Sequence, residues 1–353
     1  MQNEITSKQR LLDKDGNIAN PGFAKKLLWD YSREDIRAPK WRIKEWDYYY
    51  IGCQDYGLCL TISDAGFVSS LSVSLLGFGT EASGSAEPFM MNDGAMGVLP
   101  LGRLNLPATS EKGDIHAAVG KASMTFENDG TIRHLLGVMG DYCKTGENLT
   151  FDVTLTDIPE ESMVIATPFN KPGHFYYNQK INCMRAEGWC RLGDRKYVFN
   201  SGNGALGTLD WGRGVWTYDN TWYWGSGQTV LGDGSVFGFN IGYGFGNTSA
   251  ASENMLFYEG KSHKLKDVAF NIPRKADGTY DYMKPWTFTE TDGRFEMTFE
   301  PVIDRYDPVD FKLICMIPHQ VFGHMSGKAV LDDGKVTELD NAMVFAEHVH
   351  NKW

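Results

Sequence analysis

Hydrophobic and polar residues alternate with a period of two along most of this chain. From 149 to 156 the odd-numbered residues are Leu, Phe or Val and the even-numbered residues are Thr or Asp. The same alternation occurs within 67–75 and 295–300, and it is typical of strands that bury one face. Asp-Gly dipeptides, which suit tight hairpin turns, separate these runs; they begin at Asp15, Asp93, Asp129, Asp233, Asp277, Asp292 and Asp333. The pattern predicts an all-β protein made of antiparallel sheets.

Two stretches interrupt the alternation. Residues Pro21–Ile36 carry apolar side chains near one face of a helix, and Asn20 before them is a helix-capping residue type, so we expect one short surface helix there. Around 159–173, prolines and a glycine separate a predicted strand from the aromatic run FYYNQKINC. Since 353 residues exceed the usual size of a single core, we expect two β domains, barrels or sandwiches, that comprise residues 1–170 and 171–353.

The charge balance excludes several classes of partner. The chain has a formal net charge of −11 and an isoelectric point of about 5.2, and its basic residues are scattered, so it lacks the positive patch of a nucleic-acid-binding protein. No apolar run approaches the ~18 residues of a membrane-spanning helix, and the first residues lack the apolar core of a signal peptide. We expect a cytoplasmic protein without a membrane span. Its six cysteines are irregularly spaced, which favours free thiols over a zinc site or a disulfide framework.

The segment 209–227, LDWGRGVWTYDNTWYWGSG, is the strongest functional signal in the sequence. It holds four of the ten tryptophans, and aromatic side chains are what line concave apolar sites. A regular strand places Trp222 and Trp224 on one face, so we expect these two indoles, together with Tyr218, to line a cavity. The density of aromatic residues makes Trp211 and Trp216 ligand-binding candidates as well.

Asp210 and Arg213 stand three residues apart in this segment, and two interpretations of them remain open. They form either a catalytic acid with the partner that tunes its pKa, or a buried ion pair that fixes a turn. We favour the structural interpretation, and both residues stay catalytic candidates.

Residues 236–246, VFGFNIGYGFG, predict a strand with one bulky face and one nearly bare face. Odd-numbered positions beginning at Phe237 are aromatic or aliphatic, and even-numbered positions beginning at Gly238 are glycine except for Asn240. Glycine weakens a strand, so this row indicates that a facing sheet, a coiled barrel wall or a ligand comes close to the backbone. Close packing is the more usual use of strand glycine, and Asn240 is a ligand-binding candidate on that face.

His348 and His350 share one face of a predicted strand, and Glu347 lies on the other. Such a pair binds a metal only with a third ligand, which His319 or His324 could supply if the fold brings them together. Histidines satisfied within the protein are more common, so we expect neither a metal nor another cofactor.

Several blocks of the sequence resemble one bacterial family. They are RIKEWDYYYI, KPGHFYYNQKINCMRAEGW, LDWGRGVWTYDNTWYWGSG, FNIGYGFG with SENMLF, and HQVFGHMSG with AEHVHNKW. Together they resemble the family called domain of unknown function 2804, which is grouped with the lipocalin-like calycins, near carotenoid hydratases, tocopherol cyclases and fungal Diels-Alderases. The resemblance implies two lipocalin-like β domains with an apolar cavity. In this family context the further ligand-binding candidates are Tyr176, Lys180, Glu187, Glu253 and Asn254.

The tripeptide Gly214-Val215-Trp216 also resembles the Gly-x-Trp element of lipocalins. In that element a tryptophan closes one end of the barrel beneath an arginine. The resemblance implies that Trp216 is such a plug, covered by Arg213 or Arg191.

Three functions are compatible with these residues. The first, which we favour, is the binding of an apolar small molecule such as a lipid, quinone or isoprenoid. The second is catalysis like that of the related hydratases and cyclases, in which Asp210 as a buried acid protonates an alkene and tryptophans stabilise the carbocation. The caging residues would be Trp211, Trp222 and Trp224. The third is recognition of a carbohydrate by a β-sandwich, which fits the tryptophans but not a cytoplasmic location.

Overall fold

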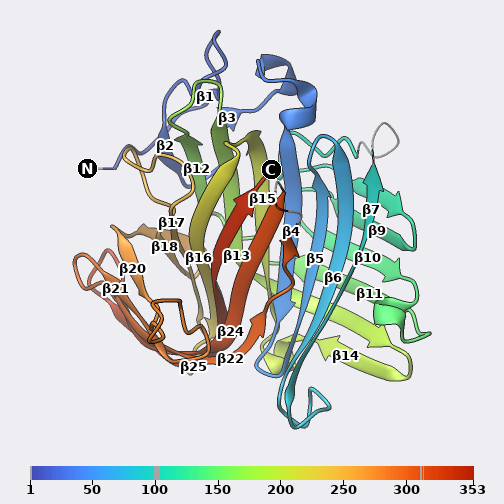
Figure 1. The fold of residues 1–353 in the computed structure, drawn as a ribbon. Helices are drawn as coiled ribbons and strands as arrows, with labels where there is room; N and C mark the ends of the chain where they lie inside the picture. Colours follow the sequence, from blue (N-terminus) through green and yellow to red (C-terminus); the bar gives the residue numbers. More distant parts are fainter. Residues whose placement is uncertain (1, 99–103, 311, 313) are drawn as a thin grey trace.

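The computed structural model describes residues 2–98, 104–310, 312 and 314–353 (Figure 1). Their secondary structure is almost entirely β-strand, so the prediction of an all-β protein is confirmed. The helical segments of this part of the chain are four 3-10 turns: η1 (Arg33–Asp35), η2 (Lys40–Arg42), η3 (Tyr142–Lys144) and η4 (Ser201–Asn203). None of the described helices is long and apolar enough to cross a membrane.

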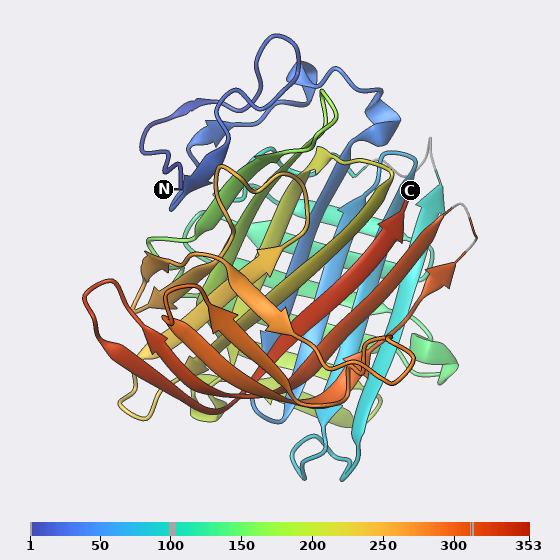
Figure 2. The same cartoon turned by 60° about the vertical axis from the view of Figure 1, so that its left-hand side comes forward.

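The first sheet has thirteen antiparallel strands within the described residues and curls into a nearly closed barrel (Figures 1 and 2). The strands are β2 (Gly22–Ala24), β4 (Lys44–Gly52), β5 (Tyr56–Asp64), β6 (Val68–Phe78), β7 (Pro88–Val98), β8 (Ile115–Val119), β9 (Ala122–Asn128), β10 (Arg133–Met139), β11 (Leu149–Thr156), β12 (Met163–Pro168), β13 (Phe175–Leu192), β14 (Arg195–Phe199) and β15 (Leu206–Val215). The main path through the sheet is β7-β6-β5-β4-β15-β13-β11-β10-β9-β8.

The second sheet has ten antiparallel strands within the described residues and forms a half-barrel. The strands are β16 (Asp219–Val230), β17 (Val236–Tyr243), β18 (Met255–Tyr258), β19 (Lys261–Lys264), β20 (Val268–Asn271), β21 (Trp286–Glu290), β22 (Phe295–Arg305), β23 (Val309–Asp310), β24 (Cys315–Val330) and β25 (Val336–Lys352). Its main path is β19-β18-β17-β16-β25-β24-β22-β21-β20. A separate parallel pair joins β1 (Gln9–Arg10) to β3 (Trp29–Asp30).

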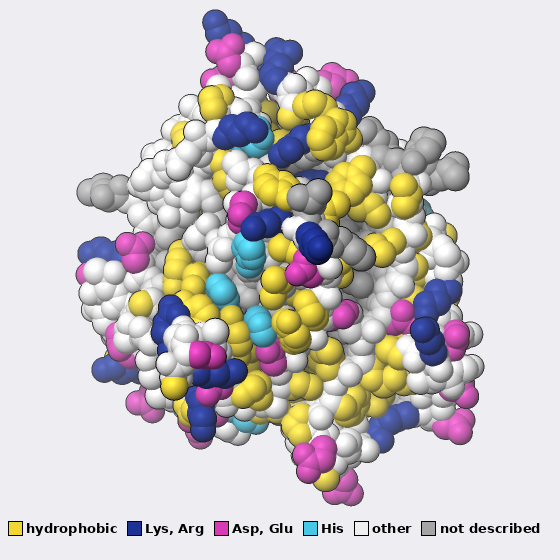
Figure 3. Space-filling view, viewed as in Figure 1, with side chains coloured by type: hydrophobic (Ala, Val, Ile, Leu, Met, Phe, Trp, Pro, Cys, Tyr) yellow, Lys and Arg dark blue, Asp and Glu magenta, His cyan; other side chains and the backbone are white. Residues whose placement is uncertain are grey.

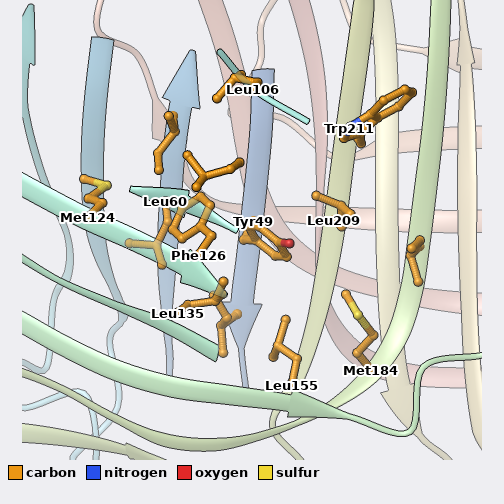
Figure 4. Packing of buried hydrophobic residues seen from close by; sticks show 14 of the residues in the cluster. Tyr49, Leu60, Leu106, Met124, Phe126, Leu135, Leu155, Met184, Leu209 and Trp211 are labelled. Atoms are coloured by element: carbon orange, nitrogen blue, oxygen red, sulfur yellow. The ribbon is translucent and has the colours of Figure 1, made fainter. Parts of the chain in front are cut away.

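The core of the first sheet follows from the alternation in the sequence. Every second residue of its strands points inward, and Figure 4 shows Tyr49, Leu60, Phe126, Leu155 and Trp211 converging from different strands. The second sheet has its own core, which is rich in phenylalanine. The six cysteines carry free thiols, four of them buried, as the irregular spacing predicts.

The prediction of a helix at Pro21–Ile36 is wrong. The segment contains β2, β3 and the short turn η1 instead. β2 is extended because it pairs with β12, and its Phe23 and the neighbouring Trp29 are buried in different clusters rather than on one helical face. Ser32 caps η1 by accepting a hydrogen bond from the Glu34 N–H. Tertiary strand pairing overrides the helical pattern here.

The two sheets pack against each other through the strands at the centre of the first sheet. All ten residues of β15 are buried, and so are most residues of β4 and of the first half of β13. One face of these strands covers the core of the first sheet, and the other faces the second sheet. There β13 lies against β16 and β17, and Tyr50 of β4 packs against Phe322 of β24 and Phe345 of β25. Side chains on this second face are therefore enclosed between the sheets, whatever their polarity.

The glycine row of β17 faces the first sheet. A Cβ added at Gly238 would lie 2.5 Å from Cys183 Sγ, so close packing between the sheets accounts for this glycine. The strand ends at Tyr243 rather than at 246. Gly244 and Gly246 then turn the chain with φ angles of +94° and +85°, which glycine adopts readily, and Phe245 joins the apolar cluster between the sheets.

The chain passes from the first sheet to the second between Val215, the last residue of β15, and Asp219, the first residue of β16. Strands β13, β14 and β15 therefore hydrogen-bond within the first sheet, although they follow residue 170. A division of the chain into independently folding domains at 170 stays a prediction.

Replacing Gly238 by Ala should destabilise the protein by about 1–3 kcal/mol, because the new methyl group overpacks the contact with Cys183 and the Gly227 carbonyl 3.0 Å away. Adding Cys183→Ala should recover part of this loss by removing the nearer atom. Urea denaturation measures both effects. The control is Gly232→Ala, where nothing lies within 4 Å of the added Cβ. If Gly238→Ala is as stable as wild type, the two sheets do not pack as closely as described.

Candidate functional site

A cavity of about 400 Å³ lies between the two sheets. The first sheet contributes residues of β4, β5, β6, β7, β13 and β15, and the second contributes residues of β16, β22, β24 and β25. Figure 3 shows hydrophobic side chains on the face where the sheets meet, with acidic, basic and histidine side chains among them. The size suits a small organic molecule.

Aromatic side chains form one half of the cavity. They are Trp46, Tyr176, Trp216, Trp222, Trp224 and Phe245. Phe245 is central to this group, because its ring centroid lies 4.8 Å from that of Tyr176, 5.3 Å from Trp216 and 5.2 Å from Trp222, each in an edge-to-face arrangement. Trp46 stacks on Tyr176 with 6.0 Å between centroids. The structure therefore places four of the predicted residues, Tyr176, Trp216, Trp222 and Trp224, in the lining of one cavity.

A buried ion pair between Lys180 and Asp210 lies beside these rings. The residues are opposite each other on β13 and β15, and Lys180 Nζ is 2.7 Å from Asp210 Oδ2. Asn178 Nδ2 donates to the other oxygen of Asp210 at 2.6 Å. The Lys180 ammonium also lies 3.7 Å from the ring centroid of Trp224, a cation–π contact. Asp210 is thus held by a cation and an amide.

The predicted ion pair between Asp210 and Arg213 is wrong. Residues three apart on a strand point to opposite faces, so Asp210 faces the cavity while Arg213 faces the core of the first sheet. Arg213 Nη2 pairs with Asp47 Oδ1 at 3.0 Å and also donates to the Pro107 carbonyl at 2.8 Å. The catalytic candidate Arg213 is therefore outside the cavity.

Trp211, and not Trp216, lies beneath an arginine. Trp211 lies under the Arg213 guanidinium, 4.4 Å from its carbon, and points into the core of the first sheet (Figure 4). Trp216 is covered by neither Arg213 nor Arg191, whose guanidinium lies over Trp189 instead. Trp211 thus has the arginine-covered position expected of Trp216, and it does not line the cavity.

Glu347 supplies a second carboxyl group to the cavity. It lies on β25 opposite Trp224, and its Oε1 accepts a hydrogen bond of 2.8 Å from Trp222 Nε1. Its Oε2 accepts another of 2.9 Å from Gln320 Nε2. Burial raises the pKa of Glu347 to about 7, despite the opposing effects of the Trp222 hydrogen bond and of the Lys180 and Arg305 charges. Near neutral pH this group therefore exists both as acid and as carboxylate.

Glu253 is a third buried carboxyl group, and burial raises its pKa as well. Asn240 Nδ2 donates to Glu253 Oε2 at 3.2 Å and to the Glu253 carbonyl at 2.9 Å. The amide oxygen of Asn240 accepts a 2.7 Å hydrogen bond from Trp224 Nε1. Asn240 therefore holds Trp224 and Glu253 in place from behind the cavity wall.

The remaining predicted ligand-binding residues lie elsewhere. Asn254 bonds to the Gly242 N–H and to the Lys266 carbonyl, a structural arrangement. Tyr218 is 46% exposed and does not line the cavity. Glu187 accepts a hydrogen bond from the Ser201 N–H in a surface turn.

The histidines lie on the other face of the second sheet. His319 and His348 are opposite each other on β24 and β25, and His348 Nδ1 is 2.7 Å from the Tyr282 hydroxyl. Burial lowers the pKa of His348 to about 4. His350 pairs with Asp219, and His319 pairs with Asp304. Among the residues that the structure describes, no three His, Cys, Asp or Glu side chains are grouped to hold a metal ion.

Sequence reasoning missed several side chains of the cavity, chiefly Trp46, Arg305, Gln320 and Glu347. A signal for Glu347 exists, because it is an acid directly after the apolar run 342–346 and alternates with His348 and His350. Trp46 stands in the block RIKEWDYYYI, where alternation separates it from the inward-facing positions. Gln320 and Arg305 carry no such signal, because their place depends on how the two sheets pack.

The cavity ion pair predicts which substitutions couple. Asp210→Asn and Lys180→Met should each cost about 3–5 kcal/mol, because either change leaves a buried group without its partner. The double variant should lose clearly less than the sum of both. Asp210→Asn combined with Arg213→Met should instead be additive within about 0.5 kcal/mol, since the two residues share no partner. Urea denaturation gives all these values, and strong coupling between Asp210 and Arg213 would contradict the geometry.

Comparison with solved structures finds the same architecture over the whole chain. The crystal structure of CghA with Sch210972 superposes with a TM-score of 0.52 and 9% sequence identity, covering 97% of each chain. Kievitone hydratase from Nectria haematococca gives a TM-score of 0.47 and 9% identity over 98% of each chain. At this identity the likeness to CghA describes the fold alone. Among curated protein sequences, none matches significantly. The sequence model of domain of unknown function 2804 matches residues 2–353, and the chain therefore belongs to this family.

Proposed function

We propose that the protein binds an apolar, unsaturated small molecule between its sheets and performs acid–base chemistry on it, with Glu347 as the proton donor. The observation that carries this proposal is the Glu347 carboxyl, buried in an aromatic cavity with its pKa raised to about 7. A general acid works best when its pKa lies near the operating pH. Perturbed carboxyl groups in a cavity of this size are a common mark of an active site.

The indole N–H groups of the cavity support this role. Trp222 donates to Glu347 and Trp224 donates to Asn240, so the indole N–H of each tryptophan is already hydrogen-bonded within the protein. Apolar ring surface therefore remains for a ligand. One face of Trp224 already holds the Lys180 ammonium, which leaves Trp222 and Trp46 as the rings that would stabilise a new cation.

The chemistry follows from these groups. Protonated Glu347 gives its proton to one carbon of a double bond, whose π electrons form the new C–H bond. The neighbouring carbon becomes a carbocation, and Glu347 becomes a carboxylate. The cation then either takes up water, which loses a proton, or loses a proton from an adjacent carbon. The first outcome is hydration and the second is isomerisation, and in both the proton lost can return to Glu347 or pass to Glu253.

Asp210, the acid expected from the sequence, has a different part in this proposal. Lys180 Nζ lies 2.7 Å from one of its oxygens and Asn178 Nδ2 donates to the other, so both oxygens are already bonded within the protein. We assign it the role of holding Lys180 against Trp224.

Binding without turnover is the second candidate. The observation in its favour is that both oxygens of Glu347 already accept hydrogen bonds, which fix the carboxyl group in the wall. A binding protein and an enzyme share the same cavity and differ in whether Glu347 gives up its proton.

Glu347→Gln should change how stability depends on pH. The folded pKa of about 7 lies above the ordinary glutamate value of 4.5, so wild type loses stability as the pH rises from about 4.5 to 7 and no further above that range. The loss is on the order of 3 kcal/mol. The charges that face Glu347 are those of Lys180, Asp210 and Arg305, and all remain in the variant. The stability of wild type minus that of Glu347→Gln, from urea denaturation, should fall over this range. A difference that is constant with pH would rule out the raised pKa.

The function itself is tested with unsaturated isoprenoids such as geraniol in D₂O. Wild type should bind them saturably and place deuterium on carbon, as mass spectrometry detects. Glu347→Gln should bind comparably but exchange no deuterium, because the amide gives no proton. Trp222→Ala should weaken binding about tenfold through lost apolar contact.

The matched control for Trp222→Ala is Trp41→Ala, because Trp41 is 54% exposed and lies outside the cavity lining. It should bind as wild type does. Binding without exchange in wild type would favour the second candidate, and absence of saturable binding would reject both.

A further inference from the structure

The half of the cavity opposite the aromatic rings is polar. Its wall is the outer face of β5, β6 and β7, where Thr61, Ser63, Ser70, Ser72 and Asn92 line the space. Thr61 and Ser72 are directly opposite each other in the sheet register. Neither of their hydroxyl groups has a hydrogen-bond partner among the described residues. These hydroxyls are therefore available to a ligand.

Arg305 lies at the end of β22 on this polar side. Its Nε donates to Ser74 Oγ at 2.9 Å, and its Nη1 donates to Gln320 Oε1 at 3.1 Å. A guanidinium has five N–H donors, so three remain without a protein acceptor in the part of the chain that the structure describes. No carboxylate of those residues lies within salt-bridge distance of it. Two hydrogen bonds thus fix its position while its charge stays unpaired.

Other charged residues line the cavity, and among them Glu45 pairs with Arg33 while Asp64 accepts a hydrogen bond from the Gly66 N–H. Lys180 is paired with Asp210, and Asp307 accepts a hydrogen bond from Asn92. Lys44, at the far end, is buried between the rings of Phe67 and Trp353. Burial lowers its pKa to about 7, so it carries only part of a charge near neutral pH. The guanidinium of arginine keeps its charge in proteins. Among the described residues, Arg305 is therefore the lasting positive charge that lines the cavity without an acidic partner.

We propose that the ligand of this cavity is an amphipathic monocarboxylic acid, whose carboxylate binds Arg305 and the hydroxyls of Thr61 and Ser72 while its apolar part lies among the tryptophans. The inference rests on the proposed function of the cavity and names its substrate class. A guanidinium matches a carboxylate with two parallel hydrogen bonds, which an alcohol or an amide cannot replace.

This position of the carboxylate connects it to the proposed chemistry. Gln320 bonds to Arg305 through its oxygen and to Glu347 through its nitrogen, so the anchor and the proton donor are separated by one amide group. The double bond that reacts is therefore close to the carboxylate end of the molecule. The positive charge of Arg305 lowers the pKa of Glu347. A bound carboxylate offsets that charge and helps Glu347 to keep its proton until the reaction.

The test compares acids with their primary amides on two scaffolds, geranate with geranamide and 4-phenylbutanoate with 4-phenylbutanamide. Calorimetry or tryptophan fluorescence gives each Kd at pH 7.5. Wild type should bind each acid about tenfold more tightly than its amide. Arg305→Met should bind acid and amide equally, with the amide affinity unchanged. Arg305→Lys, which keeps a charge without the fork, should retain a smaller preference.

Arg274→Met is the matched control, because it removes the same charge from an exposed arginine that lies between β20 and β21 and outside this cavity. It should keep the full preference for acids. The wild-type comparison decides the matter even if Arg305→Met fails to fold. Equal binding of acids and amides would overturn the carboxylate assignment and leave the proposed function intact. A preference that survives in Arg305→Met would move the carboxylate to another cation and overturn the assignment too. Failure of all four compounds to bind would overturn the carboxylate assignment, and the proposed function would fall as well if geraniol also failed to bind.

Discussion

Strands β4, β13 and β15 cover two cores at once, and this double burial constrains everything between the sheets. A strand buried on both faces is usually apolar throughout, because a polar group without a partner costs about 1–3 kcal/mol inside a protein. Here the face that packs the first barrel is largely apolar, and the Arg213 and Asp47 side chains on it form an ion pair. The other face carries Lys180, Asp210 and Asn178, so each of these groups must find its partner within the interface.

The interface solves this problem in two ways. Lys180 and Asp210 form an ion pair with each other, and the Trp224 ring is an additional contact for the ammonium. Glu347 and Glu253 are instead driven towards the neutral acid by burial, as their raised pKa values indicate. Isolated buried carboxylates are too costly to keep, and neutralisation is the usual relief. The burial that limits charge between the sheets thus makes Glu347 an acid able to release a proton near neutral pH.

The sequence predicts local features of this fold well and their combination poorly. Alternation and Asp-Gly turns are local signals, so the strands follow from them, and Trp222 and Trp224 share the cavity wall as their spacing predicts. The same alternation of side chains along a strand, applied to Asp210 and Arg213, predicts that they lie on opposite faces of β15. The partner of Asp210 is Lys180, 30 positions away along the chain, because the register between β13 and β15 sets that contact.

Contacts between residues that are far apart along the chain are even harder to predict from the sequence. Arg305 meets Ser74 across 231 positions, and Trp222 meets Glu347 across 125. The pattern at 21–36 fails for the same reason, since β2 takes its conformation from pairing with β12. The period of the sequence pattern predicts which face of a strand a residue is on. It does not predict which strand of the other sheet packs against that face.

A cavity whose two walls belong to different sheets exists only while those sheets are docked. A molecule that fills it contacts both walls and so stabilises the docking of the two sheets. Hydrogen bonds between the sheets, such as that from Arg305 on β22 to Ser74 on β6, contribute to the same docking. At a concentration a hundred times Kd, such a ligand adds about 2.7 kcal/mol to the folded state. Its occupancy would join the melting of the barrel and the half-barrel into one cooperative event, so the number of transitions in a calorimetric trace would report whether the space between them is full.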